Sequence, residues 1–249
     1  MLSPAEIDRY ARQMALPGIG RAGQERLQSA SVLLVGVGGL GSASSQYLAA
    51  AGVGRIGLVD GDRVERSNLQ RQVVHGEGSV GQPKVASAAA RLAEANPHVR
   101  LDTYDCYLTA TNAAEIAADY DVILDGADNF PARFLCNDIG FALRKPVVHA
   151  AVERFAGEVT VFAPHAGGPC YRCLLPVPPD PDAVPADADA RVLGALAGVI
   201  GSLQALEALK WLVGLGDPLV GRMVHLDALR GCWREIRLRR DPACPLCGG

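Results

Sequence analysis

Residues 31–41 read SVLLVGVGGLG, an apolar run that ends in a cluster of glycines. Val32–Val35 has the composition of a buried strand, and residues 40–51 have that of a helix. A second apolar run, Arg55–Asp60, follows the predicted helix. Strand, glycine-rich turn, helix and strand in this order predict a βαβ unit with the layout of a dinucleotide-binding fold.

Four glycines, Gly36, Gly38, Gly39 and Gly41, form the pattern G-x-G-G-x-G. Glycine lets the backbone approach a phosphate closely, and the following helix N-terminus offers free N–H groups. Asp60, at the end of the next strand, stands where a carboxylate usually accepts ribose hydroxyls. The motif alone also suits a simple tight turn or a nicotinamide-dinucleotide site, so it indicates a nucleotide without naming one.

Helical and strand patterns continue to alternate outside this unit. Residues 4–29 predict one or two amphipathic helices. Helices are predicted at 83–96, 111–118 and 131–143, and strands at 99–106, Asp121–Asp125 and Val147–Ala150. Pro83 is expected at the first helical position. The alternation predicts a Rossmann-like, doubly wound, mainly parallel sheet.

The pattern changes in the C-terminal part. Strands predicted at Gly157–Ala163, 222–227 and 232–238 flank a largely buried helix at 194–213, which favours antiparallel strands added to the sheet. Residues 176–190 hold five prolines, four aspartates and no Lys or Arg, so we expect a mobile surface loop there. With no evident linker, we expect one domain: N-terminal helices (1–29), a nucleotide-binding half (30–150) and a C-terminal half (151–249).

Composition limits the function classes. The 249 residues are 49% hydrophobic and 20% charged, which suits a soluble globular protein with a substantial core. A net charge of −3 gives no reason to expect nucleic-acid binding. The sequence has no uninterrupted apolar run long enough for a membrane span and no apolar signal core at its start. We therefore expect a cytoplasmic protein that binds neither membrane nor nucleic acid.

Two C-x-x-C pairs, Cys170/Cys173 and Cys244/Cys247, lie about 70 residues apart. Four thiolates in two such pairs are typical of a closed, tetrahedral structural zinc site. A redox pair and unpaired core thiols are the alternatives, but a redox motif needs no second pair and the tail DPACPLCGG is too polar for a core. The pattern predicts that zinc joins the tail to the rest of the C-terminal half.

Residues 60–84 read DGDRVERSNLQRQVVHGEGSVGQPK. This segment resembles the ATP site of the ubiquitin-activating superfamily, and within it the ThiF/MoeB/HesA adenylyltransferases, nearest to the molybdopterin-synthase adenylyltransferase group. Further matches are R-Y-x-R-Q at residues 9–13, D-N at 128–129, C-Y-R-C at 170–173 and G-V-I-G-S at 198–202. The resemblance therefore runs almost from end to end.

The resemblance implies ATP- and magnesium-dependent adenylation of the C-terminal glycine of a small ubiquitin-like sulfur carrier of the MoaD/ThiS type. The products would be an acyl-adenylate and pyrophosphate, and the carrier would bind the 151–249 half. The alternatives are an inactive scaffold that binds ATP or the carrier, a nicotinamide-dependent oxidoreductase and a dehydratase acting on modified transfer RNA. Which carrier and which pathway are not readable from the sequence.

The resemblance also assigns roles to individual residues. Arg12 and Lys84 would contact the phosphates, Asp128 would hold magnesium, and Arg71 would be an arginine finger supplied across a homodimer. The implied nucleotide-binding set is Gly36, Gly38, Gly39, Gly41, Asp60, Asp62, Ser67, Asn68, Leu69, Gln70, Arg71, Gln72, Lys84, Asp128 and Asn129. A carboxylate substrate is already ionised at neutral pH, so no general base is needed. The five histidines show no metal spacing or triad pattern.

Three cysteines remain outside the pairs, namely Cys106, Cys136 and Cys232. Many relatives carry a further cysteine, in a loop before G-V-I-G-S, that bonds covalently to the carrier. Alignment from that motif places Asp187 at this position, and residues 174–231 contain no cysteine. We therefore predict that the chemistry ends at the acyl-adenylate and that another protein transfers the sulfur.

Overall fold

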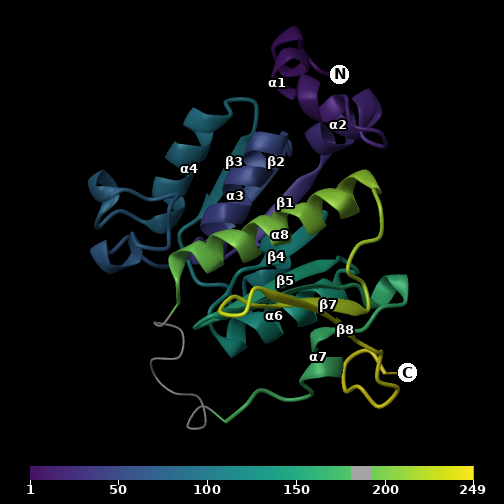
Figure 1. Cartoon of the computed structure of the whole chain (residues 1–249). Coiled ribbons are helices and arrows are strands. Elements are labelled where there is room, and N and C mark those ends of the chain that lie inside the picture. The colour runs from purple at the N-terminus through teal and green to yellow at the C-terminus, as the bar shows by residue number, and fades with distance from the viewer. Residues whose placement is uncertain (181–191, 249) are drawn as a thin grey trace.

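The computed structural model describes residues 1–180 and 192–248, which form two helical layers around one mixed sheet (Figure 1). The sheet has eight strands in the order β3-β2-β1-β4-β5-β6-β7-β8. The parallel part comprises β1 (Ser31–Val35), β2 (Arg55–Val59), β3 (Arg100–Tyr104), β4 (Val122–Asp125) and β5 (Val147–Glu153). The antiparallel part adds β6 (Ala156–Phe162), β7 (Arg222–Asp227) and β8 (Cys232–Arg237). This arrangement confirms the predicted fold class.

Alternation along β1 explains why the sheet is covered on both faces. Val32 and Leu34 pack into one apolar cluster, and Leu33 and Val35 into another. A strand buried on both faces reads as a continuous apolar run, as SVLLV does. The first face carries α3 (Gly39–Ala51), α4 (Lys84–Ala95) and α8 (Gly194–Val213). The other carries α5 (Ala113–Ala117), α6 (Phe130–Ala142) and the short α7 (Tyr171–Leu174).

The turn between β1 and α3 needs glycine at two positions. Gly36 has φ +90, a conformation that residues with a side chain rarely adopt, and a Cβ there would lie 2.8 Å from the carbonyl oxygen of Gly126. A Cβ on Gly41 would meet the Gly36 carbonyl oxygen at 2.2 Å. The glycines therefore let β1, α3 and the loop after β4 converge on one point.

The helix predicted at 83–96 begins one residue later than expected. Pro83 has φ −54 and ψ 134 and is the N-cap, so Lys84 is the first helical residue. The reason is a bridge between Pro83 and Arg63, which keeps Pro83 extended. Lys84 is thereby placed at a helix N-terminus on the carboxyl side of the sheet.

Helix α8 is the one helix among the described residues that is long and apolar enough, by length and composition, to cross a membrane. It instead packs across α3 and over β5 and β6. A Cβ on Gly201 would lie 2.4 Å from the Leu40 carbonyl oxygen, so the two helices cross at close range. Its apolar composition is accounted for by this central position (Figure 1).

The N-terminal helices α1 (Pro4–Met14) and α2 (Gly20–Ser29) lie together at one end of the molecule (Figure 1). Ser3 and Glu6 form a capping box that starts α1. The side chains of Gln13 and Gln24 both donate to the Ala51 carbonyl, at the C-terminal end of α3. These bonds fix α1 at the end of α3 that is remote from the glycine turn.

Candidate functional site

A cavity of about 570 Å³ opens where β1, β2 and β4 end, a size that suits a small-molecule site. Ten of the residues predicted to bind nucleotide line it: Gly36, Gly38, Gly39, Asp60, Asp62, Arg71, Gln72, Lys84, Asp128 and Asn129. These residues come from five separate stretches of sequence, between residues 36 and 129. The fold brings them together at the carboxyl ends of parallel strands, where ligands of open α/β sheets bind.

Asp60 holds the glycine turn in place. Its two carboxylate oxygens accept the backbone N–H groups of Val37 at 2.8 Å and of Asp62 at 2.9 Å. Burial raises the pKa of Asp60, although the charge of Lys84 and the two backbone bonds oppose that rise. The carboxylate therefore fixes the turn through its backbone bonds and also faces the cavity.

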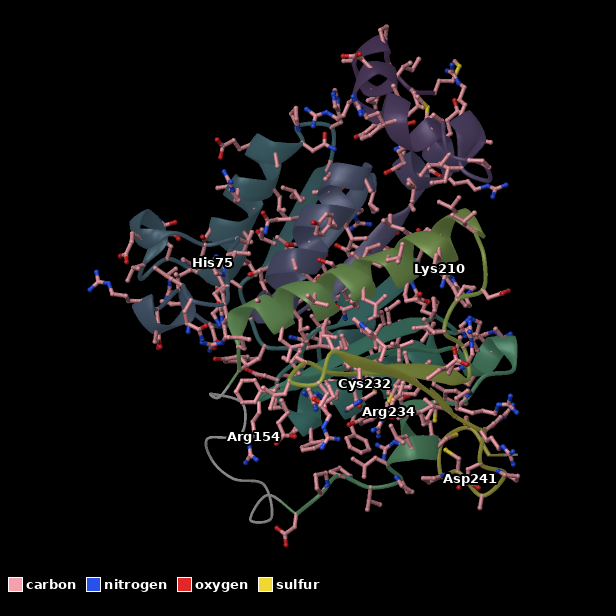
Figure 2. All side chains as sticks on the ribbon, in the orientation of Figure 1. His75, Arg154, Lys210, Cys232, Arg234 and Asp241 are labelled. Carbon is pink, nitrogen blue, oxygen red and sulfur yellow. The ribbon has the colours of Figure 1, made fainter. Side chains whose placement is uncertain are left out.

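His75 (labelled in Figure 2) also supports the glycine turn, because it connects Val37 to Ser87 of α4. Its Nε2 lies 3.1 Å from the Val37 carbonyl oxygen and its Nδ1 lies 2.9 Å from the Ser87 hydroxyl. A carbonyl can only accept, so Nε2 carries the proton and Nδ1 accepts from Ser87. Burial lowers the pKa of His75, which keeps the ring neutral. No spacing pattern in the sequence singles out this histidine, because Val37 and Ser87 lie 38 and 12 residues away from it.

Lys84 is the most deeply buried cation of the cavity, with 6% of its surface exposed. Its Nζ lies 2.7 Å from Asp62 Oδ2, and the hydroxyl of Tyr107 donates to Asp62 Oδ1 at 2.5 Å. Burial opposes ionisation of Asp62, but the bonds from Lys84 and Tyr107 outweigh it and lower the pKa of this carboxyl. The ammonium is thus held at the cavity wall by an ionised carboxylate.

Two arginines of the cavity have no carboxylate partner among the described residues. Arg71 Nη1 donates to the Ser67 carbonyl at 3.2 Å, and its side chain lies beside Gly39 of the turn. Arg133 Nε donates to the Ala127 carbonyl at 3.1 Å, and its guanidinium lies over the Phe130 ring. The predictions included Arg71 and omitted Arg133.

Asp128 is exposed at the cavity wall, directly before α6. Asn129 is the N-cap of α6: its Oδ1 accepts the Ala132 N–H at 3.0 Å, and its Nδ2 donates to Asp128 Oδ1 at 3.2 Å. The other carboxylate oxygen has no partner among the described residues and is available to a cation. Asn129 therefore caps the helix, and the neighbouring Asp128 is available to bind a ligand.

Behind this loop lies a buried charged cluster that the sequence analysis missed. His149 Nδ1 lies 2.7 Å from Asp125 Oδ2, and His149 Nε2 lies 3.8 Å from Glu158 Oε1. Burial disfavours the charged ring, but the bonds to Asp125 and Glu158 prevail and raise the pKa of His149. The pairing of β4 with β5 indicates this contact, because Asp125 and His149 occupy paired positions of the two strands.

Six predicted site residues do not line the cavity: Arg12, Gly41, Ser67, Asn68, Leu69 and Gln70. Gly41 serves close packing, and Asn68 Oδ1 caps a short turn by accepting the Glu65 N–H. Arg12 is exposed on α1, which is bonded to the far end of α3. The thirteen residues of α3 span about 20 Å, so Arg12 is remote from the cavity of its own chain.

The four paired cysteines converge at the other end of the molecule. Their sulfurs all lie within 4.8 Å of one another, with 3.9 Å between Cys170 and Cys173, 3.6 Å between Cys170 and Cys244, and 3.4 Å between Cys173 and Cys247. A tetrahedral site with zinc–sulfur bonds of 2.3 Å places sulfurs about 3.8 Å apart. The N–H of Asp241 (Figure 2) is directed at the Cys173 sulfur at 3.4 Å, as in sites that favour the thiolate form. The donor set and spacing fit zinc.

The sequence profile of the ThiF family matches residues 10–246, nearly the whole chain. This chain belongs to the ThiF family. A protein from Thermus thermophilus named "Sulfur carrier protein adenylyltransferase" is 53% identical over 98% of this chain and 91% of its own length. "Adenylyltransferase and sulfurtransferase MOCS3" from Bos taurus is 52% identical, but this chain spans only 54% of its length.

Solved structures agree with this assignment at the level of the fold. The crystal structure of E. coli MccB matches all of this ThiF-family chain and 74% of its own, with a TM-score of 0.85 at 21% identity. An identity this low supports a shared fold but says nothing about the substrate. The family resemblance expected from residues 60–84 is confirmed by the profile and by the Thermus relative.

Proposed function

We propose that this chain uses ATP to adenylate the C-terminal glycine of a small ubiquitin-like sulfur-carrier protein. A carboxylate oxygen of the carrier bonds to the α-phosphorus, the bond from that phosphorus to the bridging oxygen breaks, and pyrophosphate leaves. The observation that carries the proposal is one cavity that joins a glycine turn, Asp60, three cations and the exposed Asp128 carboxylate. The 53% identity to a named sulfur carrier protein adenylyltransferase supports the reaction class.

The sheet order supports one orientation of ATP. Across the carboxyl edge, β2 with Asp60 is followed by β1 with the glycine turn and then by β4 with Asp128. The ribose would lie at Asp60, and the phosphates would lie along the turn at the N-terminus of α3. Lys84 and Arg71 would offset the negative charge of the triphosphate. The total negative charge at the site increases when the anionic carboxylate of the carrier approaches.

Magnesium would bind at Asp128. Mg²⁺ at nucleotide sites is usually held by one or two carboxylates together with phosphate oxygens and water. Asp128 offers an exposed carboxylate, whereas Asp62 is committed to Lys84 and Tyr107. The ion would neutralise charge on the phosphates and on the departing pyrophosphate.

Placement of the arginines favours roles different from those expected from the sequence. Arg71 lines the cavity of its own chain, so we propose that it acts there and not across an interface. A phosphate contact from Arg12 requires a second copy of the chain, because its own cavity lies at the opposite end of α3. An isologous homodimer would give each cavity one Arg12 from its partner.

The cysteine cluster would hold a structural zinc ion through Cys170, Cys173, Cys244 and Cys247. All four ligand positions are then filled by protein, so this metal would stabilise the fold and take no part in adenylation. Binding by thiolates is consistent with a reducing compartment, and we retain the prediction of a cytoplasmic location.

We further propose that the reaction ends at the acyl-adenylate. Position 187, where the expected covalent cysteine would stand, is an aspartate and lies outside the described residues. A separate protein would therefore complete sulfur transfer.

ATP–pyrophosphate exchange with purified candidate carriers tests the proposal. Exchange that depends on the carrier and on an intact Gly-Gly terminus is the expected result. Tight ATP binding without exchange for any carrier would favour the alternative, a scaffold that binds nucleotide or carrier without reacting.

A further inference from the structure

The cavity holds a third cation, Arg133, that neither the sequence motifs nor the proposed nucleotide contacts use. Arg133 lies in the first turn of α6 and lines the cavity, and its charge acts on His149 of β5 and Glu158 of β6. Lys84 is bonded to Asp62, and Arg71 lies at the glycine turn, so both are placed on the nucleotide side of the cavity. The charge of Arg133 helps to lower the pKa of Glu158, but Arg133 forms no ion pair with a carboxylate among the described residues and can meet an anion that enters the cavity.

The neighbours of Arg133 fix the position of its guanidinium. One nitrogen, Nε, is bonded to the Ala127 carbonyl at 3.1 Å, and the group lies 5.5 Å from the centroid of the Phe130 ring. The guanidinium also bonds to the Tyr171 hydroxyl, and it forms no ion pair with a carboxylate among the described residues. A guanidinium has five N–H donors, so these two contacts leave donors for an anion.

The reaction requires a second anion at this point. The incoming carboxylate must lie next to the α-phosphate although both are negative, and Asp128 adds a third negative group. An adjacent guanidinium lowers the cost of bringing these charges together and holds the carboxylate in one orientation. Val152 of β5, an apolar residue, also lines the cavity.

We propose that Arg133 binds the C-terminal carboxylate of the carrier and aligns it with the α-phosphate. This inference rests on the proposed function. It separates the cations of the site into two groups: Lys84 and Arg71 serve the nucleotide, and Arg133 serves the acceptor. The guanidinium also holds the Ala127 carbonyl, so one residue couples the carboxylate to the loop that carries Asp128.

The test compares Arg133→Gln with wild type in two assays. In ATP–pyrophosphate exchange at saturating ATP, the variant is expected to raise the KM for the carrier by about tenfold or more, the strength of a charge-assisted hydrogen bond. ATP affinity, measured by calorimetry without carrier, should stay within about twofold, since Arg133 is not a phosphate contact. Arg71→Gln is the matched control and should weaken ATP binding.

A second comparison separates loss of the carboxylate contact from indirect effects of a disturbed loop at Ala127. The carrier that supports exchange is prepared with a free C-terminal carboxylate and with a C-terminal amide. Binding of each is measured with the α,β-methylene analogue of ATP, which does not react. Wild type should prefer the carboxylate by about tenfold, and Arg133→Gln should show no preference, because loop distortion weakens both tails equally.

The outcomes separate the two proposals. Loss of the carboxylate preference in the variant, with wild-type exchange intact, supports the inference. An unchanged preference, or a loss of ATP affinity equal to that of Arg71→Gln, overturns it while leaving the adenylation proposal standing. Absence of exchange by the wild-type chain with every carrier removes the proposed function and this inference together.

Discussion

The carboxylate of Asp125 is shared between His149 and the loop that carries Asp128. One oxygen lies 2.7 Å from His149 Nδ1, and the other accepts the Ala127 N–H at 3.1 Å. Gln204 of α8 donates to the backbone carbonyl of the same Asp125 at 2.8 Å. The exposed Asp128 thus lies on a loop that the buried Asp125–His149 pair holds in place. The G-A-D-N turn therefore has a defined position.

Replacing His149 by Gln should lower the free energy of unfolding by about 3 kcal/mol, because it leaves the buried Asp125 and Glu158 without their charged partner. Urea unfolding at pH 6 measures the effect. His98→Gln is the matched control, since His98 is exposed, and should change stability by less than about 0.5 kcal/mol.

The stability difference between wild type and His149→Gln should also depend on pH. The pKa of His149 is raised in the folded state, so its contribution is fully present below the ordinary histidine pKa and is lost as pH rises through the folded value. The pKa of Glu158 is lowered, so its contribution is lost at the acid end. Denaturant unfolding from pH 5 to 9 should show the difference shrinking toward high pH. A difference that grows with pH would contradict a protonated His149.

Removal of zinc should destabilise the C-terminal tail. The cluster joins α7 to residues 244–247 without a disulfide, as all seven cysteines among the described residues are free. Cys173→Ser is expected to abolish stoichiometric zinc in elemental analysis and to lower the melting temperature by several degrees. Cys232→Ser, outside the cluster, should leave both quantities unchanged. Full zinc content in Cys173→Ser would show that the metal is held elsewhere.

The parts of the site that were predictable are those carried by continuous sequence. The segment from Asp60 to Lys84 and the two cysteine pairs stand in fixed spacing, so pattern alone located them. Arg133 and His149 could not be found in this way. Their partners are Ala127, Asp125 and Glu158, and their roles arise from strand pairing and from the first turns of α6, which only the fold brings together.

The fold itself was predicted almost completely, because strands buried on both faces and glycine-marked turns leave strong signals. Pro83 shows where local preference failed. Proline is favoured at the first helical position, but the bridge to Arg63 kept this one extended. The distance of Arg12 from the cavity of its own chain was likewise hidden from the sequence, since the motif does not show how far α1 lies from the cavity.

Neutralising Lys84 should affect the nucleotide more than the carrier. Lys84→Met keeps the apolar stem but removes the charge, which leaves Asp62 without its cation next to the triphosphate. We expect a loss of at least about 100-fold in exchange activity, mostly through ATP affinity. Arg66→Met removes an exposed cation of the same segment that pairs with Glu77, and should stay within about twofold of wild type.

Subunit complementation tests which arginine crosses the dimer. If Arg12 serves the partner's cavity, a mixture of Arg12→Ala and Asp128→Ala chains forms heterodimers with one complete cavity. Equal mixing should then recover about a quarter of wild-type exchange, because half of the dimers are mixed and each has one active cavity. A mixture of Arg71→Ala and Asp128→Ala should recover nothing, since Arg71 lines its own cavity and both sites stay defective. Recovery by the Arg71 mixture instead would assign the crossing residue to Arg71, and recovery by neither would exclude a shared site.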